Sequence, residues 1–292
     1  FARADLQAKV ESIDKSPDPQ TGWLVGDVVP AADPSALAAL PRTFPHGGYL
    51  VIGDALHSPQ EFRATFDCGP LGANRVAGHG HADALSVTVS WAGESLLIDS
   101  GTYCYNAAPE LRHFFRGTRA HNTLVVDGLD QSEYGASFLW LRDVNCKLLE
   151  QATEGAQWAH ASHDGYMRLP DPVTHHRRVS LCPDGGALLT EDWLDCRESH
   201  DIELFWHAAP GTSLLPSDDG VWTVSASGRS LRITIEGAEV DASVVSGRES
   251  PPQGWASSRF YEREAAPVRM PGGQRLVRFL EHLVIRLILA DE

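Results

Sequence analysis

The chain has 292 residues, of which 42% are apolar, and its Asp and Glu residues outnumber Lys and Arg by 39 to 24. The net charge of −15 argues against a general nucleic-acid-binding protein, and no apolar run reaches the roughly 18 residues that a membrane helix needs. The five cysteines contain no CxxC pair and match neither a disulfide framework nor a zinc ribbon. We therefore expect a globular protein with one main core.

The first 45 residues show no sustained pattern of helix or strand. A short helix-like start, ADLQAKVESI, is followed by two connectors rich in proline, KSPDPQTG and VVPAADPSALAALPRTFP. Such composition is typical of linkers. We predict that residues 1–45 are a linker, or the tail of a preceding domain, and that residues 46–292 form the folded domain.

From Gly48 onward the pattern is that of β-strands. Short apolar or alternating runs are separated by clusters of Gly, Pro, Asp and Ser. About a dozen strands at this spacing predict an all-β fold, a large antiparallel β-sandwich with a short helical or irregular N-terminal segment. The runs are GGYLVIGD, EFRATFDCG, ALSVTVSW, SLLIDSGTY, HNTLVVDG, HHRRVSLC, GALLTEDWL, HDIELFWHA, VWTVSA, SLRITIEG and RLVRFLEHLVIRLIL.

One hairpin can be placed from its turn. ALSVTVSW and SLLIDSG flank a short glycine-containing turn at residues 92–94, and this register sets Val87 opposite Asp99. His81 would then lie roughly 20 Å from that pair if the strand stayed extended. For His81 and Asp99 to share a site, the glycine-bracketed segment at residues 78–80 must fold back, or the two strands must not be direct partners.

His81, Asp99 and His121 could form a metal site, with His79 beside them. Asp99 interrupts the apolar run LLIDSG, where an unpaired carboxylate would be costly to bury. Two imidazoles and one carboxylate are a common zinc ligand set. The alternative is that these histidines are hydrogen-bonded core or loop residues, which spacing alone favours.

The segment LRHFFRGTRAHN, residues 111–122, is basic and aromatic in an otherwise acidic chain. Arg112, Arg116 and Arg119 lie within it, and no acidic residue does. Guanidinium groups bind carboxylate or sulfate in a bidentate manner, so the segment could hold an acidic ligand. A solvated loop whose arginines pair with nearby acids is an equal alternative.

Later histidines and some tyrosines are weaker candidates. The segments HDGY, THHRR and FWHAAPG, together with His200, are interpreted as mostly structural. Tyr103, Tyr105 and Tyr166 could carry protons, although an ordinary tyrosine pKa of about 10 makes each a poor base.

Two long blocks together resemble a known family. AGHGHADALSVTVSWAGESLLIDSGTYCYN and RHFFRGTRAHNTLVVDGLDQSE resemble the signature of the heparinase II/III-like family of polysaccharide lyases. HDGY, HHRRVSL, TEDWL, HDIELFWHAAPG and SSRFYEREAAPV follow in the same order, so the resemblance covers roughly residues 47–270.

The resemblance implies an antiparallel β-sandwich that follows an α-helical toroid, with the active site between them. It implies a zinc ion on His81, Asp99 and His121, structural rather than catalytic, and a catalytic role for His79 at the cleft. The substrate-binding residues would be Arg112, Arg116, Arg119 and Tyr105. Asp83 is then expected to hold its loop by hydrogen bonding.

The implied reaction is β-elimination at a uronic acid unit of an acidic polysaccharide. It requires neutralising the C6 carboxylate, abstracting the C5 proton and protonating the departing glycosidic oxygen. In the family the principal tyrosine acid/base comes from the toroid. We therefore expect the chain to need a toroid domain of the same parent chain and to be inactive alone. We also expect a periplasmic or secreted location, which the cysteines do not decide.

Two other functions stay open. The first is a non-catalytic acidic-carbohydrate-binding or assembly module that keeps the sandwich and the metal site. The second, less favoured, is a zinc hydrolase with an open coordination position, which would need a general base near His81.

Overall fold

The computed structural model describes residues 42–72, 77–183, 186–217, 221–236, 242–271, 274–276 and 283–291. Most of the predicted N-terminal linker, residues 1–41, lies outside these ranges. The remainder of that segment enters the first sheet, because Thr43 pairs with Leu50 and Phe44 pairs with Tyr49. No helix in the described part of the chain is long and apolar enough to cross a membrane.

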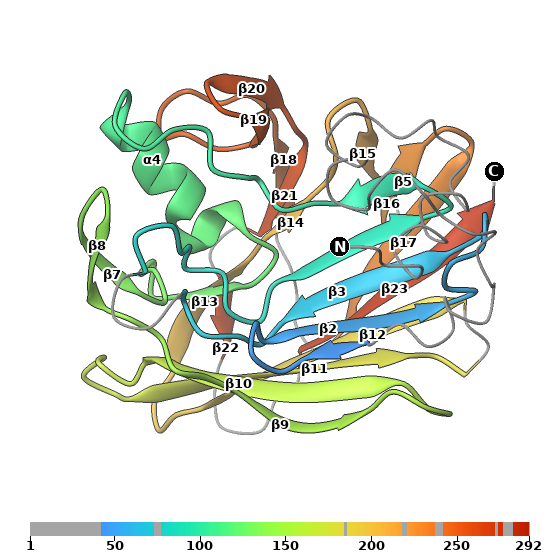
Figure 1. Cartoon of the computed structure of the whole chain (residues 1–292), viewed down its shortest axis with the longest axis horizontal. Helices are drawn as coiled ribbons and strands as arrows, with labels where there is room; N and C mark the ends of the chain where they lie inside the picture. The colour runs from blue at the N-terminus through green and yellow to red at the C-terminus, as the bar shows by residue number, and fades with distance from the viewer. Residues whose placement is uncertain are drawn as a thin grey trace, which may run out of the picture.

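The first layer is a five-stranded antiparallel sheet in sequential order (Figure 1). Two of its strands, β3 (Phe62–Asp67) and β4 (Val87–Trp91), alternate buried apolar and half-exposed polar side chains, as period-2 patterning requires. The β4–β5 turn places Ala92 and Gly93 at φ +47° and +87°, which suits a two-residue hairpin turn. The strands are β1 (Thr43–Phe44), β2 (Tyr49–Asp54), β3 (Phe62–Asp67), β4 (Val87–Trp91) and β5 (Glu94–Leu97).

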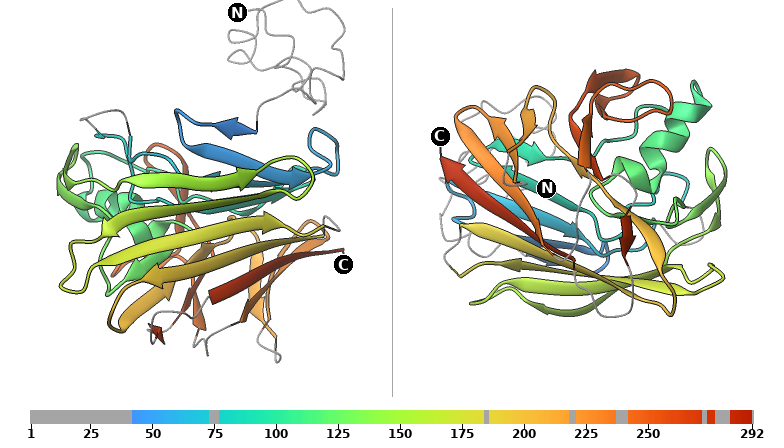
Figure 2. Two further views of the ribbon diagram at one scale, coloured as in Figure 1. Left: turned by 90° about the horizontal axis from the view of Figure 1, so that it is seen from below. Right: turned by 180° about the vertical axis from the view of Figure 1, so that it is seen from behind.

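The second layer is an eight-stranded antiparallel sheet that faces the first (Figure 2). The last described strand of the chain, β23, lies in its middle, between β17 and β12. In spatial order the strands are β15 (Ser213–Pro216), β16 (Trp222–Ala226), β17 (Arg229–Glu236), β23 (Leu283–Asp291), β12 (Ala187–Asp195), β11 (Val173–Leu181), β10 (Trp158–Tyr166) and β9 (Cys146–Ala152).

Smaller elements gather toward one end of the two layers (Figure 1). One three-stranded sheet contains β22 (Gln274–Leu276), β13 (His200–Leu204) and β6 (Leu124–Val126). A second contains β14 (Trp206–His207), β21 (Val268–Pro271) and β18 (Ala242–Val245). Two hairpins are β7 (Glu133–Ala136) with β8 (Leu139–Arg142), and β19 (Trp255–Arg259) with β20 (Glu262–Ala265). The helices within the described ranges are α4 (Pro109–Arg116) and the 3₁₀ helix η1 (Thr118–Ala120).

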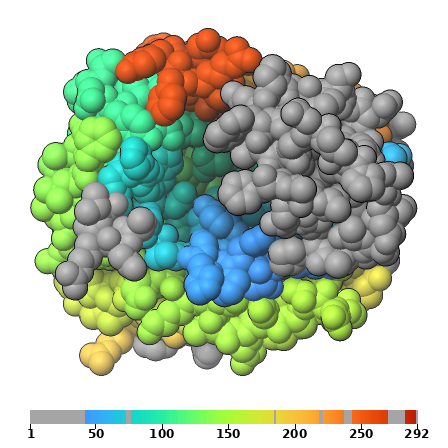
Figure 3. Space-filling view, viewed as in Figure 1, coloured from blue at the N-terminus to red at the C-terminus, as the bar shows by residue number. Residues whose placement is uncertain are grey.

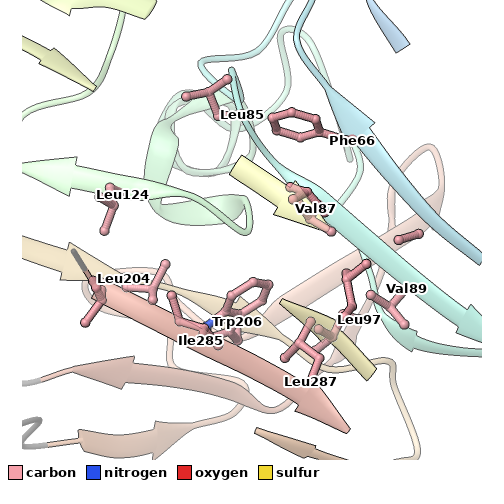
Figure 4. Close-up of a cluster of buried hydrophobic side chains, with 14 of the residues drawn as sticks. Phe66, Leu85, Val87, Val89, Leu97, Leu124, Leu204, Trp206, Ile285 and Leu287 are labelled. Carbon is pink, nitrogen blue, oxygen red and sulfur yellow. The ribbon is translucent and has the colours of Figure 1, made fainter. Parts of the chain in front are cut away.

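The main core fills the space between the two large sheets. Val87, Val89 and Leu97 from the first sheet pack in one cluster with Ile285 and Leu287 from β23 (Figure 4). This burial of apolar side chains is the principal force that holds the layers together. The predicted all-β antiparallel sandwich is confirmed.

Candidate metal centre and aromatic surface

The segment that precedes β4 folds back on itself. The strand begins at Val87, and upstream of it Leu85 has a positive φ of 64°. The Ser86 N–H donates to Asp83 O and the Gly80 N–H donates to Ala77 O, so residues 77–86 form turns. Gly80 is required here, because a Cβ on it would lie 1.9 Å from the Leu71 carbonyl oxygen. The chain therefore folds back before β4, which is one of the two arrangements that would let His81 and Asp99 share a site.

The fold-back brings His81, Asp99 and His121 together. Asp99 lies just past β5 and His121 just past η1, and one ligand atom from each of the three side chains lies within 4.8 Å of the others. His121 Nδ1 is 2.5 Å from Asp99 Oδ2. The rings of His81 and His121 have centroids 5.3 Å apart. The predicted His-Asp-His set is therefore a spatial cluster.

The charges within the cluster are strongly coupled. Burial, together with the nearby charge of His121, lowers the pKa of His81 to about 3. Loss of hydration opposes ionisation of Asp99, but the charge and hydrogen bond of His121 outweigh it and hold the pKa of Asp99 below its usual range. Although burial disfavours its charged form, Asp99 raises the pKa of His121 to about 9. His81 is thus neutral and Asp99 anionic near pH 7.

A divalent metal fits these residues. His121 Nε2 is buried and has no hydrogen-bond partner within the described ranges. Two imidazoles and a carboxylate leave room for a fourth ligand in tetrahedral zinc coordination. On metal binding, His121 would lose the proton from whichever ring nitrogen ligates the ion, as ligation requires deprotonated donors.

Asn122 and Arg177 hold the loops around the cluster, and sequence reasoning did not assign either a role at the site. The Asn122 side-chain amide donates to Val87 O at 2.8 Å and to Ile98 O at 3.0 Å, which joins β4 to the segment after β5. Arg177 Nη1 donates to Leu85 O and to Asn122 O, both at 2.6 Å. An asparagine at the start of the apolar run TLVV was the available signal for a buried bridging amide.

His79 and Tyr105 meet on the surface beside this cluster. His79 Nδ1 and Tyr105 Oη are 2.8 Å apart. The Tyr105 ring stacks on Phe138 at 5.2 Å between centroids and tilts against Phe260 at 5.5 Å. Phe138 and Phe260 are 45% and 57% exposed, so this group, which we call the aromatic surface, faces solvent. Sequence reasoning did not single out either phenylalanine.

The three predicted substrate-binding arginines do not form one patch. Arg112 and Arg116 lie one turn apart on the buried face of α4 and donate to the carbonyls of Gly78, Ala136 and Ser137. The Arg112 guanidinium lies 4.8 Å from the centroid of the Tyr105 ring, and that of Arg116 stacks on Trp140. Their contacts hold the loop that carries His79.

Arg119 is exposed and faces a different part of the surface. Its guanidinium pairs with Glu203, and both line a cavity of about 390 Å³ together with His113, Asp130, Arg248 and Gln253. This ion pair matches the alternative of a solvated arginine paired with an acid.

Tyr166 cannot carry protons to a ligand in this structure. It is fully buried, and its hydroxyl donates to the carbonyls of Leu124 and Leu129. Burial raises the pKa of Tyr166 far above its usual value. Of the tyrosines considered from the sequence, Tyr105 is the one that contacts His79.

One face of the molecule is recessed. In the space-filling view the surface is hollowed between the orange surface of β19 and β20, the green surface around α4 and the blue surface of β1 and β2 (Figure 3). The β19 segment closes over the loop after β5, because the Ser257 N–H donates to Ser100 O. Gly101, at φ +81°, makes this approach possible: a Cβ there would lie 2.1 Å from Ser257 O.

The molecule is thus a two-layer antiparallel sandwich with a histidine-rich site at one end. The chain belongs to the heparinase II/III-like family, because the model of that family's C-terminal domain matches residues 37–275. The resemblance drawn from the motifs is therefore confirmed. No curated protein sequence matches the chain.

Solved structures share this fold. A heparinase III, the BT4657 gene product, superposes with a TM-score of 0.67 at 18% identity, over 87% of this chain and 37% of its own. The heparan sulfate lyase HepC from Pedobacter heparinus gives a TM-score of 0.68 at 14% identity, over 85% and 36%. At such identities the likeness shows the fold, and this chain corresponds to little more than a third of each of these structures.

Proposed function

We propose that this chain is the C-terminal β-sandwich of a polysaccharide lyase that cleaves a uronic-acid-containing acidic polysaccharide by β-elimination. The observation that carries the proposal is the 2.8 Å contact between His79 Nδ1 and Tyr105 Oη, on the surface of a heparinase II/III-like chain. An imidazole and a phenol held in this way are groups that can bind an acidic sugar and exchange protons with it.

Each residue of this surface has a proposed role. His79 donates a hydrogen bond to the C6 carboxylate of the uronate, and this offsets the negative charge that develops when the C5 proton leaves. Tyr105 fixes the orientation of the His79 ring, and its own ring, with Phe138 and Phe260, offers an apolar face to a sugar ring. Arg119 lies on a different part of the surface, paired with Glu203, and its contact with a further acidic group of the polymer stays a prediction.

Arg112 and Arg116 act mainly as positioning residues in this proposal. Their burial and their bonds to the carbonyls of Gly78 and residues 136–137 support the loops that carry His79 and Phe138. A direct contact with substrate stays a prediction for both.

We also propose that His81, Asp99 and His121 hold a structural zinc ion. The clustered donor atoms and the unpartnered Nε2 of His121, within the described ranges, support it. When bound, zinc would tie together three loops that are distant in sequence and so fix the backbone next to His79. Zinc content, measured by elemental analysis, should fall by one ion per chain in His81→Ala. An unchanged content and melting temperature would contradict this assignment.

A helical toroid domain of the same parent chain would supply the remaining acid/base group. The much greater length of the similar solved lyases supports this part of the proposal. A periplasmic or secreted location is proposed with it, since the substrate is a polymer outside the cell.

The lyase proposal is tested on the full-length parent protein. Heparan sulfate, chondroitin sulfate and alginate are each incubated with the enzyme, and the ultraviolet absorbance of the unsaturated uronate is followed. His79→Ala should lower kcat by about 10²- to 10⁴-fold on the active substrate. His46→Ala, at an exposed histidine away from the described contacts, should leave kcat unchanged. No absorbance on any polyuronate would contradict the proposal.

The exposed aromatic surface also favours a second candidate, a non-catalytic module that binds acidic carbohydrate. Affinity electrophoresis in gels that contain the same glycans separates the two functions. Retarded migration that is weakened by salt and by Arg119→Ala, without any unsaturated product, would support binding alone.

A further inference from the structure

A second cluster of metal-binding side chains lies apart from the residues discussed above. Asp171 is in the turn between β10 and β11, Cys196 follows β12, and His200 opens β13. One donor atom from each of the three lies within 4.8 Å of the others. The cluster shares no residue with the His81–Asp99–His121 set.

The three donors suit zinc in both chemistry and burial. A thiolate, an imidazole and a carboxylate are all zinc ligands, and soft sulfur together with nitrogen disfavours magnesium or calcium. Cys196 and His200 are 8% and 5% exposed, and the side chain of Asp171 is 9% exposed. The donors are therefore largely removed from water, yet a small fourth ligand can still reach them.

The surroundings orient these donors. Asp127 Oδ2 lies 2.7 Å from His200 Nδ1, and its other oxygen accepts the Asp201 N–H, so the carboxylate fixes the imidazole ring. His200 Nε2 then points toward Asp171 Oδ2, 3.1 Å away. A carboxylate that holds the far nitrogen of a histidine is the usual support of a metal-ligating imidazole.

Asp171 in turn holds the loop between the other two ligands. Its Oδ2 accepts the N–H groups of Arg197 at 2.8 Å and Glu198 at 2.6 Å. Because residues 197 and 198 lie between Cys196 and His200, this contact sets the spacing of thiol and imidazole. The arrangement is thus formed by the backbone before any ion binds.

We propose that Asp171, Cys196 and His200 form a second zinc site, with water as the fourth ligand. On binding, the thiol proton of Cys196 and any proton on His200 Nε2 pass to solvent. The ion would join the eight-stranded sheet, through the segments that flank β11 and β12, to the small sheet of β13 and β6. It would act as a structural clip near the end of the sandwich that carries the candidate catalytic surface.

A proton is the competing occupant of this position. The hydrogen bonds of His200 with Asp127 and Asp171 outweigh its burial and raise its pKa, so an imidazolium between two carboxylates would use the same contacts. The two occupants differ at sulfur, because the proton leaves Cys196 a thiol whereas zinc requires its thiolate.

Cobalt(II) distinguishes them, since its thiolate complexes have a near-ultraviolet charge-transfer band. Chelator-treated chain carrying His81→Ala is titrated with cobalt, and the band is expected to saturate at one equivalent and to be displaced by zinc. Cys196→Ser in that background should abolish the band. Cys182→Ser, at a half-buried cysteine after β11, should leave it unchanged. Asp127→Asn should weaken cobalt affinity by about 10- to 100-fold.

Alkylation of the unaltered chain tests the same site without relying on variants, which can fail to fold. Zinc should slow the alkylation of Cys196, followed by mass spectrometry, and leave that of Cys182 unchanged. Absence of a thiolate band, a band that survives Cys196→Ser, or equal alkylation with and without zinc would overturn the second site. None of these outcomes bears on the lyase proposal, whose test measures polysaccharide cleavage.

Discussion

At the scale of single residues, Arg177 and Asp192 are a fully buried ion pair. Asp192 receives hydrogen bonds from Arg177 Nε at 2.8 Å and Nη2 at 3.0 Å, and from His175 Nε2 at 2.7 Å. The remaining guanidinium nitrogen of Arg177 reaches the carbonyls of Leu85 and Asn122. A charge pair in the sandwich interior therefore supports the loops of the site.

Asp192→Asn should lower the free energy of unfolding by about 3–5 kcal/mol, because it leaves the guanidinium of Arg177 buried without a counter-charge. Urea denaturation followed by tryptophan fluorescence measures the change. Asp195→Asn is the matched control on the same strand: that side chain is 67% exposed and pairs with His176, so its loss should cost at most about 1 kcal/mol. Equal losses in the free energy of unfolding for the two substitutions would contradict the expectation that the buried ion pair contributes more than the exposed one.

Gly80 provides a second test at this scale. An alanine Cβ 1.9 Å from the Leu71 carbonyl oxygen must displace the loop, so Gly80→Ala should destabilise the chain by about 1–3 kcal/mol. It should also lower the zinc content, since His81 is the next residue. Gly47→Ala, whose Cβ would meet its nearest neighbour at 3.5 Å, should change neither quantity. Thermal melts and elemental analysis are the measurements, and a Gly80→Ala protein with normal zinc would contradict the expectation.

At the scale of elements, β10 and β11 pair two buried histidines across the sheet. His163 Nε2 lies 3.1 Å from His175 Nδ1, and the Gly165 N–H donates to His163 Nδ1. These bonds need both imidazoles neutral, because each ring uses one nitrogen as acceptor. Burial lowers the pKa of both side chains. The nearby charges of His175 and Arg177 lower the pKa of His163 further, whereas Asp192 partly offsets the effect of burial on His175.

Stability should therefore fall on acidification. The unfolded chain binds protons at these histidines below about pH 6.5 while the folded chain does not, so their contribution is full above that pH and declines below it. The slope should be at most about 1.4 kcal/mol per pH unit for each histidine. His163→Gln should remove one such contribution between about pH 6.5 and pH 5. Urea denaturation of chelator-treated protein at several pH values tests this, and identical slopes in wild type and variant would contradict it.

The alternation of apolar and polar residues predicted several strands, whereas elements without such a pattern were not predicted. β3, β4, β11 and β12 alternate strictly, and their positions follow from the sequence. β4 nevertheless starts at Val87, because the left-handed conformation of Leu85 ends the extended chain there. β9 was not predicted, since most of its side chains are exposed and its pattern is irregular. The helix α4 was missed because its eight residues carry two arginines on the buried face.

At the scale of the whole molecule, only part of the candidate site could be predicted from the sequence. The His81, Asp99 and His121 set came from a resemblance to a family, and spacing alone favoured core histidines. Only the three-dimensional arrangement shows their common location, the burial of Arg112 and Arg116, and the separation of Arg119 from both. The support from Arg177 could not be foreseen, because its guanidinium binds the backbone carbonyl of Leu85, 92 positions earlier in the chain.

The two large sheets share one core, and this predicts how the molecule unfolds. Trp206 of β14 is fully buried in the cluster that contains Leu97 of one sheet and Ile285 of the other (Figure 4). Trp206→Ala should therefore lower the free energy of unfolding by about 3–5 kcal/mol, whereas Leu215→Ala, at a side chain 63% exposed, should change it by at most about 0.5 kcal/mol. Because neither sheet can keep its buried face without the other, circular dichroism and fluorescence should report one coincident transition in all three proteins. Two separate transitions in the Trp206→Ala protein would mean that the layers are stable independently.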